Sequence, residues 1–161
     1  MKEIFLKAGE FFFGGGRRRV HTLLGSCVTV TLWHPRRHMG GMCHYVLPAR
    51  PRLPGAAPDA RYADEAFELF DRAIAREGTR ADEYHAKIFG GGNMLAKTLA
   101  RQNPDVGGQN IAAARALLAK RGVPLVSEHV GGAGHRKLFF DLWSGEVWLN
   151  FQDITQAASH G

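Results

Sequence analysis

The sequence predicts an α/β sandwich in which helices pack on a mixed β-sheet, within a single domain spanning residues 1–161. Two segments show the three- and four-residue apolar spacing of amphipathic helices, and short β-branched or aromatic segments are interleaved with them. Glycine and proline turn signals divide those segments into hairpins toward both ends of the chain. The chain has 161 residues, 45% of them hydrophobic and 22% charged. This composition is typical of one globular domain, and no repeat or linker divides it.

The first two predicted strands form a hairpin. Residues 28–33 are β-branched or aromatic and end at a proline turn, residues 34–37. The second strand is predicted at residues 42–47, after Gly40 and Gly41, which would allow close approach of the backbones. Residues 48–58 contain four prolines and little apolar content, which predicts a loop long enough to be a flap.

Two helices are predicted from apolar periodicity. Residues 62–76 form the first, ended by Gly78, and its apolar face is expected to cover a sheet. That face consists of Ala63, Ala66, Phe67, Phe70 and Ile74. Residues 110–120 form the second helix, with Ile111, Ala114, Leu117 and Leu118 directed inward and Gly122 at its end.

The remaining strands are short. Residues 85–89 predict one that runs into a Gly-Gly-Gly-Asn segment at residues 90–93, and residues 124–130 predict another after the second helix. Residues 137–151 are expected to form two strands around a turn at residues 143–145. Because hairpins are interleaved with helical connections, strand directions should be mixed.

Several classes of protein are excluded or disfavoured. No segment approaches the roughly 20 apolar residues that cross a bilayer, and the N-terminus does not resemble a signal peptide, so we expect a cytoplasmic protein without membrane insertion. Two cysteines without Cys-x-x-Cys spacing fit free thiols in a reducing compartment. The net charge of +6 makes acidic partners plausible, but the arginines at 17–19, 36–37, 50 and 52 lie beside turn residues, which favours the simpler interpretation of solvated loop charge. No nucleic-acid-binding motif is present.

Cys27 is the first candidate for chemistry. It follows the small residues Gly25 and Ser26 at the start of a predicted strand, a turn that could expose the sulfur and direct nearby N–H groups at an oxygen bound to it. A buried structural cysteine is the simpler alternative, because free cysteine is among the most buried residue types.

His44 is the second candidate, since it lies on the strand predicted to pair with the one that Cys27 begins. Neighbouring strands are about 4.8 Å apart, so side chains on one face can come within hydrogen-bond distance. Side chains alternate along a strand, so Cys43 should point away from the face of His44. A histidine that is merely buried and hydrogen-bonded is the alternative.

Five segments, taken together, resemble the CheD chemoreceptor glutamine deamidases of bacterial and archaeal chemotaxis. They occur in the family's order from Val20 to Phe151, and they are Leu24-Gly25-Ser26-Cys27-Val28, Gly40-Gly41-Met42-x-His44 through Leu47-Pro48, Lys87 to Met94, Asn110-Ile111, and Gly131-Gly132 followed by Arg136-Lys137. The resemblance implies a cysteine-hydrolase fold related to deamidating toxins, with Cys27 as nucleophile and His44 as acid/base. A threonine shortly before the cysteine orients the histidine in this family, which points to Thr22.

The resemblance also implies the reaction and its partners. Glutamine side chains of methyl-accepting chemotaxis receptors would be hydrolysed to glutamate through a thioester, as by a protein-glutamine glutaminase, with no metal or organic cofactor. Cys27 and His44 would act as a thiolate–imidazolium ion pair. The main alternative is a non-catalytic adaptor that binds receptors and a CheC-type phosphatase. Nucleotide binding at residues 90–93 lacks the Gly-Lys-Ser/Thr sequence of a phosphate loop, and the histidines lack zinc-site spacing.

Overall fold

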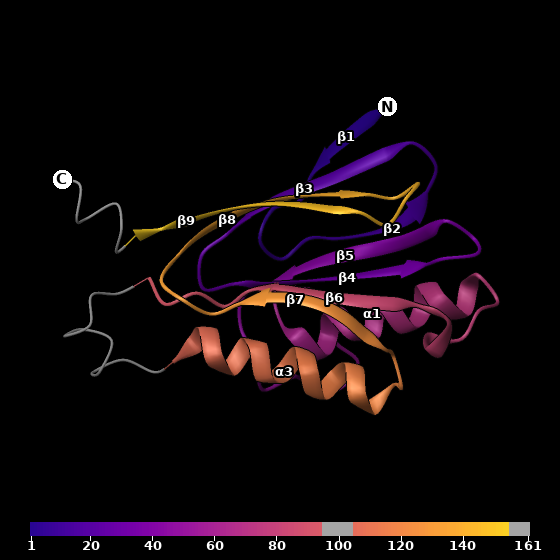
Figure 1. Cartoon of the computed structure of the whole chain (residues 1–161). Helices are drawn as coiled ribbons and strands as arrows, with labels where there is room; N and C mark the ends of the chain where they lie inside the picture. Colours follow the sequence, from indigo (N-terminus) through magenta and orange to yellow (C-terminus); the bar gives the residue numbers. More distant parts are fainter. Residues whose placement is uncertain (95–104, 155–161) are drawn as a thin grey trace.

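The computed structural model describes residues 1–94 and 105–154 and arranges them in three layers (Figure 1). A four-stranded sheet forms one outer layer, a five-stranded sheet lies in the middle, and two helices cover the other face of the five-stranded sheet. The predicted α/β class is confirmed. The expectation of one sheet is corrected to two, because the N-terminal strands and the C-terminal hairpin pair with one another rather than with the central strands.

The five-stranded sheet is built around the predicted hairpin. Its strands pair antiparallel except for the last pair, which is parallel. In spatial order they are β2 (Phe11–Gly15), β5 (Met39–Tyr45), β4 (Val28–His34), β6 (His85–Gly90) and β7 (Leu125–Val130). β4 therefore lies at the centre of this sheet.

The four-stranded sheet combines both ends of the described chain. Its first pair is parallel and the other pairs are antiparallel. In spatial order the strands are β1 (Lys2–Phe5), β3 (Arg18–Leu24), β8 (Gly134–Asp141) and β9 (Val147–Asp153). The loops before and after β3 join the two sheets.

The three layers enclose two hydrophobic cores. Helices α1 (Ala63–Arg76) and α3 (Val106–Lys120) pack on one face of the five-stranded sheet, and a short 3-10 helix, η1 (Ala81–Glu83), precedes β6. The helix-side core includes the apolar face predicted for α1. The second core lies between the sheets and includes Val20, Leu24, Met42, Leu138 and Phe140. β4 and β5 thus contact a core on each face.

The element predictions hold best where local pattern and packing agree. β4, β6, β7 and α1 begin and end within one residue of the predicted limits. β5 begins three residues earlier than predicted and ends two residues earlier, and α3 begins four residues earlier. Glycines explain both early starts, because a Cβ on Gly40 would overlap the Leu32 carbonyl and one on Gly107 would overlap the Gly91 carbonyl. These glycines permit close packing and do not end the elements.

The segment predicted as a flap is fastened to α1 by arginine–carboxylate pairs. Glu65 is buried and bonds Arg50 through two contacts of 2.9 Å, and Arg52 bonds Glu68 at 2.7 Å. Bidentate pairs around a buried carboxylate hold a loop more firmly than exposed pairs do. Two arginines that could have served acidic partners are therefore committed to the protein itself.

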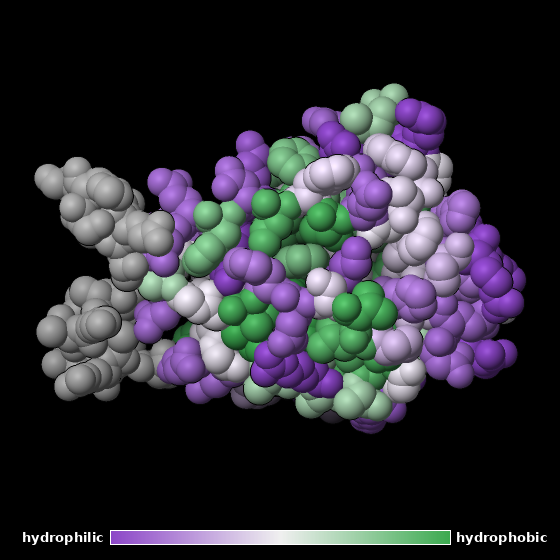
Figure 2. Space-filling view, in the orientation of Figure 1, coloured by the Kyte–Doolittle hydropathy of each residue, from purple (hydrophilic) through white to green (hydrophobic). Residues whose placement is uncertain are grey.

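Part of the molecular surface is apolar. Figure 2 shows hydrophobic side chains over the middle of one face and hydrophilic side chains at the right-hand end. β7 crosses this view, and its residues Leu125 and Val126 are exposed. In the described part of the chain, neither helix has the length and hydrophobicity of a membrane-spanning segment.

Candidate active site

The β4–β5 hairpin places Cys27 and His44 on one face of the five-stranded sheet. Thr29 stands opposite His44, and Cys27 lies two residues before Thr29, so their side chains share a face. The N–H of His44 donates to Glu10 at 3.3 Å, and its carbonyl accepts from Gly9 at 2.7 Å. These bonds point away from β4, so Thr29 and His44 form a non-hydrogen-bonded pair. Cys27 is thus diagonal to His44, a geometry with backbone separations of about 7–8 Å that side chains can span.

The two cysteines face opposite cores. Cys27 is partly exposed and borders the core between the sheets, whereas Cys43 is fully buried in the helix-side core. Burial raises the pKa of Cys43 to about 12. The sequence prediction that Cys43 points away from His44 agrees with its place in the helix-side core, and Cys27 is the more exposed of the two thiols.

Thr22 orients the imidazole of His44. Its Oγ1 lies 2.7 Å from His44 Nδ1 and 2.6 Å from the carbonyl oxygen of Leu6, and both side chains are buried. A carbonyl only accepts, so the single hydroxyl proton goes to Leu6 and Thr22 accepts from Nδ1. The neutral ring therefore carries its proton on Nδ1, which leaves the lone pair on Nε2.

Burial favours the neutral forms of both candidate groups. It raises the pKa of the Cys27 thiol, and it lowers the pKa of His44 from 6.5 to about 4. The ion pair expected from the sequence would need a lowered pKa for Cys27 and a raised pKa for His44, the opposite of both shifts. Within residues 1–94 and 105–154, no hydrogen bond joins Cys27 to His44. Both pKa shifts therefore favour a neutral Cys27 thiol and a neutral His44 imidazole.

The glycine segment after β6 holds the turn that carries Cys27. Gly91 donates its N–H to the Cys27 carbonyl at 2.9 Å, and Gly92 donates to the Gly25 carbonyl at 3.0 Å. Gly90 has φ +108°, and a Cβ there would overlap the Cys27 carbonyl oxygen. Two N–H groups that a phosphate cradle would need are thus used within the protein. The segment supports the turn that carries Cys27.

The N–H of Cys27 lacks the partner that regular pairing would give it. Val28 pairs with Gly90, so the next pair would join Cys27 and Gly91 by two hydrogen bonds. One forms, but φ of +68° at Gly91 directs its carbonyl against Gly107 of α3. In the part of the chain that the structure describes, the N–H groups of Ser26 and Cys27 donate to no protein acceptor. Both remain available to an oxygen held at Cys27.

Asn110 connects the turn that carries Cys27 to the end of the strand that carries His44. Its Nδ2 donates to the carbonyl oxygens of Ser26 at 3.2 Å and Val46 at 2.8 Å, and its side chain is fully buried. The Tyr45 hydroxyl donates to the Asn110 carbonyl. Ser26 directly precedes Cys27, and Val46 lies two residues after His44, so one amide fixes both supports. The sequence marked Asn110 as a motif residue but gave it no role.

Among the described residues, no group of three or more His, Cys, Asp or Glu side chains gathers in a way that could hold a metal ion. Of the three candidate residues predicted from the sequence, Thr22 and His44 are hydrogen-bonded to each other, and Cys27 lies on the same face of the five-stranded sheet as His44.

Comparison with known proteins identifies the family. The model named "CheD chemotactic sensory transduction" matches residues 46–151. A Dechloromonas aromatica protein named probable chemoreceptor glutamine deamidase CheD 3 is 56% identical over 151 residues, which cover 94% of this chain and 88% of that protein. The chain belongs to the CheD family. Its CheD relatives include a Pseudomonas savastanoi pv. phaseolicola protein, 44% identical over 94% of this chain and 86% of its own, and a Leptospira interrogans protein, 38% identical over 95% of each.

The CheD match and the site geometry are complementary. The family model begins at residue 46, after Thr22, Cys27 and His44, whereas the CheD relatives align over more than nine-tenths of the chain. The glycine segment and Asn110 lie inside the matched range. Both parts of the site, the reactive side chains and the backbone that supports them, thus belong to a chain of the CheD family.

Proposed function

We propose that this protein hydrolyses glutamine side-chain amides of chemoreceptors to glutamate and ammonia, with Cys27 as nucleophile and His44 as acid and base. The observation that carries the proposal is the Leu6–Thr22–His44 hydrogen-bond chain, which leaves His44 Nε2 as a base on the face that Cys27 shares. The names of the CheD relatives, probable chemoreceptor glutamine deamidases, supply the substrate class.

The first half-reaction forms a thioester. Cys27 Sγ attacks the amide carbon of glutamine while its proton passes to His44 Nε2, and the carbonyl electron pair moves onto the oxygen. The free N–H groups of Ser26 and Cys27 stabilise that oxyanion. His44 then gives the proton to the nitrogen, the C–N bond breaks, and ammonia leaves. The neutral starting pair suits this order, because the thiol loses its proton only as attack proceeds.

The second half-reaction releases glutamate. Neutral His44 accepts a proton from water, whose oxygen attacks the thioester carbon, and the C–S bond breaks as the proton returns to Cys27. Thr22 keeps Nδ1 protonated in both halves, so Nε2 is the nitrogen that exchanges the proton. The sum is one amide and one water converted to one carboxylic acid and one ammonia.

The partners and the compartment belong to the same proposal. Methyl-accepting chemotaxis receptors are the protein substrate, and a CheC-type phosphatase is a second partner, as the CheD resemblance implies. We place the reaction in the cytoplasm, and the two free thiols, Cys27 and Cys43, agree with a reducing compartment.

The test compares Cys27→Ala with Cys43→Ala, which removes the other thiol. Receptor fragments are incubated with each purified protein, and glutamine conversion is measured as ammonia release and as a mass gain of about one dalton per site. Wild type and Cys43→Ala, if folded, should convert the fragments, and Cys27→Ala should not. Full activity of Cys27→Ala would end the proposal.

The adaptor alternative gives a different pattern. A receptor-binding protein without catalysis would retain fragments in a pull-down as both wild type and Cys27→Ala, with no ammonia from either. A hydrolase would bind in both forms but release ammonia only as wild type.

A further inference from the structure

A pocket outside the catalytic groups opens on the outer face of the four-stranded sheet. Its volume is about 380 Å³, enough for one amino-acid side chain, and it lies where β3 ends at Leu24 while β8 and β9 continue. Gly25, two residues before Cys27, forms part of its wall. The pocket is therefore a neighbour of the turn that carries Cys27.

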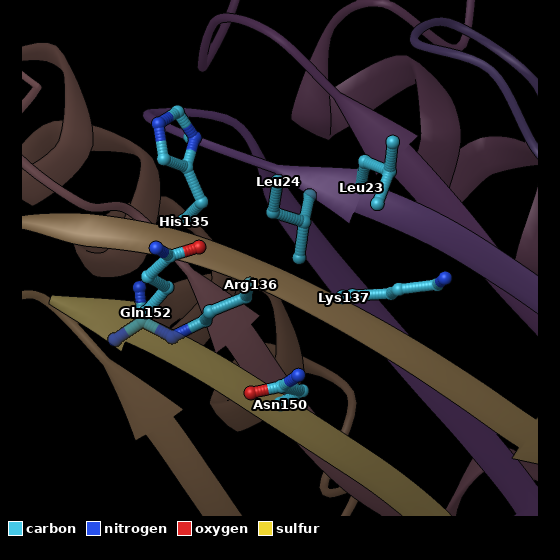
Figure 3. A pocket seen from close by; sticks show the side chains of 8 residues that line it. Leu23, Leu24, His135, Arg136, Lys137, Asn150 and Gln152 are labelled. Carbon is cyan, nitrogen blue, oxygen red and sulfur yellow. The ribbon is translucent and has the colours of Figure 1, made fainter. Parts of the chain in front are cut away.

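Strand register builds the lining of this pocket. Leu23, Lys137 and Asn150 form one row across β3, β8 and β9, and His135 and Gln152 form the next row. In Figure 3, His135 and Gln152 lie at one end, Lys137 extends at the other, and Leu24 lies between them. The pocket thus combines an apolar wall with amide and cationic groups.

The charge of the lining is positive and uncompensated. Lys137 presents its ammonium on the outer face, whereas Arg136 lines the pocket from the neighbouring row, whose side chains face the core between the sheets; no acidic side chain lines the pocket. The buried Arg136 guanidinium donates to His129 Nδ1 at 3.0 Å and to the Gly131 carbonyl at 2.7 Å, both neutral acceptors. In the described part of the chain, Arg136 Nη1 has no hydrogen-bond partner, and neither cation forms an ion pair. Such a lining favours an anion with an aliphatic stem.

We propose that this pocket binds a glutamate or aspartate side chain of the substrate, close to the glutamine that Cys27 attacks. The inference rests on the proposed function, because it assigns the pocket to the same substrate. Two residues of extended chain span at most about 7 Å, so the wall of the pocket at Gly25 lies within that distance of the Cys27 backbone. Side chains three or four residues apart on a helix are about 5–6 Å apart at Cβ, so a helical substrate can present a glutamine and a carboxylate to two neighbouring sites.

The carboxylate would meet Lys137, whose flexible stem allows its ammonium to turn inward, and the amide groups of Asn150 and Gln152. Lys137 Nζ now lies 5.5 Å from the centre of the Phe139 ring, a contact that an arriving carboxylate can replace. The aliphatic stem would lie along Leu23, whose side chain is exposed on this face. The pocket would thereby select acidic segments and orient the neighbouring glutamine.

The experiment measures binding to the Cys27→Ala protein, so that no reaction interferes. Three labelled helical peptides carry one central glutamine and, four residues away, a glutamate, an alanine or a lysine. Fluorescence anisotropy should show the glutamate peptide binding at least about fivefold more tightly than the lysine peptide, as a charge-assisted hydrogen bond predicts. Lys137→Glu in the same background should abolish or reverse that preference.

Lys120→Glu is the matched control. It makes the same change in net charge at the end of α3, on the opposite side of the five-stranded sheet, and should keep the wild-type preference. Equal affinity for the three peptides, no binding of the glutamate peptide, or an unchanged preference in Lys137→Glu would overturn the proposal. Ammonia release from receptor fragments by the wild-type protein tests the hydrolase separately, so either idea can fail alone.

Discussion

At the scale of single residues, one hydroxyl decides which nitrogen of His44 is basic. Thr22 Oγ1 has one proton and two neighbours, and the Leu6 carbonyl can use only that proton. The imidazole must then donate from Nδ1, whatever the substrate. A backbone atom near the N-terminus therefore sets the protonation of a side chain on a strand far along the chain.

Replacing Thr22 with valine tests this arrangement. Valine has nearly the same shape as threonine but removes the acceptor of His44 Nδ1–H, so the imidazole loses its preferred tautomer. We therefore expect kcat to fall at least about tenfold, with KM little changed. Steady-state ammonia release from receptor fragments measures both constants. Thr22→Ser keeps the hydroxyl and should restore most of kcat. Equal activity of the valine and serine variants would show that the hydroxyl has no part in the reaction.

At the scale of residues, the sequence predicted correctly which face of the sheet each side chain occupies, because side chains alternate along a strand. Cys27 and His44 share a face and Cys43 is turned away, as the two-residue period of a strand requires. The directions of the pKa shifts at Cys27 and His44 run against the expected ion pair, and the sequence did not reveal them because desolvation depends on the surrounding fold. Asn110 and Leu6 were missed as supports, since each acts through contacts with backbone atoms that no local pattern reveals.

At the scale of elements, the glycine segment after β6 holds the turn at residues 25–27 in position. Gly91 and Gly92 donate to carbonyls on either side of Ser26, and Gly90 leaves the space that the Cys27 carbonyl fills. The turn is therefore positioned by a neighbouring strand end and not by its own sequence.

Gly90→Ala should displace that turn. The added Cβ would overlap backbone at φ +108°, a conformation that side chains rarely adopt, so the Cys27 carbonyl must move. Because small misplacements of reacting groups are costly, we expect kcat/KM on receptor fragments to fall at least about tenfold.

Gly78→Ala is the control for Gly90→Ala. Gly78 also has positive φ, +69°, but open space surrounds its Cβ position. It should lower stability by about 1 kcal/mol and leave activity unchanged. Equal loss of activity in both variants would mean that backbone strain, and not contact with the turn, is responsible.

Element prediction failed in a consistent way. The predicted β5 and second helix began too late, because Gly40 lies inside β5 and Gly107 lies inside α3. β1, β2 and β3 were not predicted at all. β3 contains Arg18 and Arg19, which were interpreted as loop charge, yet Arg19 pairs with Asp141 at 2.6 Å across the sheet. The pairing partner lies more than a hundred residues away, beyond the range of any local signal.

At the scale of the whole molecule, folding removes a proton-binding site from water. The pKa of His44 is about 4 in the folded protein against an ordinary value of 6.5, with burial as the main cause. Between these values the unfolded imidazole takes up a proton and the folded one does not, so acid favours unfolding. The contribution of neutral His44 to the free energy of unfolding is therefore fully present above about pH 6.5 and is lost as the pH falls toward 4.

Urea unfolding should show this linkage. We expect the free energy of unfolding to be about 2 kcal/mol lower at pH 5 than at pH 7 through His44. His44→Gln should lose that part of the pH dependence, whereas replacement of the exposed His85 should keep it. An unchanged slope in His44→Gln would show that the imidazole is not desolvated by folding.

The α/β class was predictable because alternating strand and helix patterns allow few layer arrangements. The division into two sheets was not, since it depends on β3 pairing with β8 across the full length of the chain. The single-domain assignment for residues 1–161 stays a prediction, and the sharing of β4 and β5 by both cores supports it.

The central place of β4 has a consequence for how the protein loses activity. Strands covered on both faces exchange their amide hydrogens with solvent only when the entire structure opens, whereas loops and edges exchange through small local fluctuations. Cys27 immediately precedes such a strand and His44 lies on its neighbour. The catalytic geometry therefore belongs to the most cooperative part of the molecule, and mild destabilisation should leave each folded copy fully competent while reducing the number of folded copies.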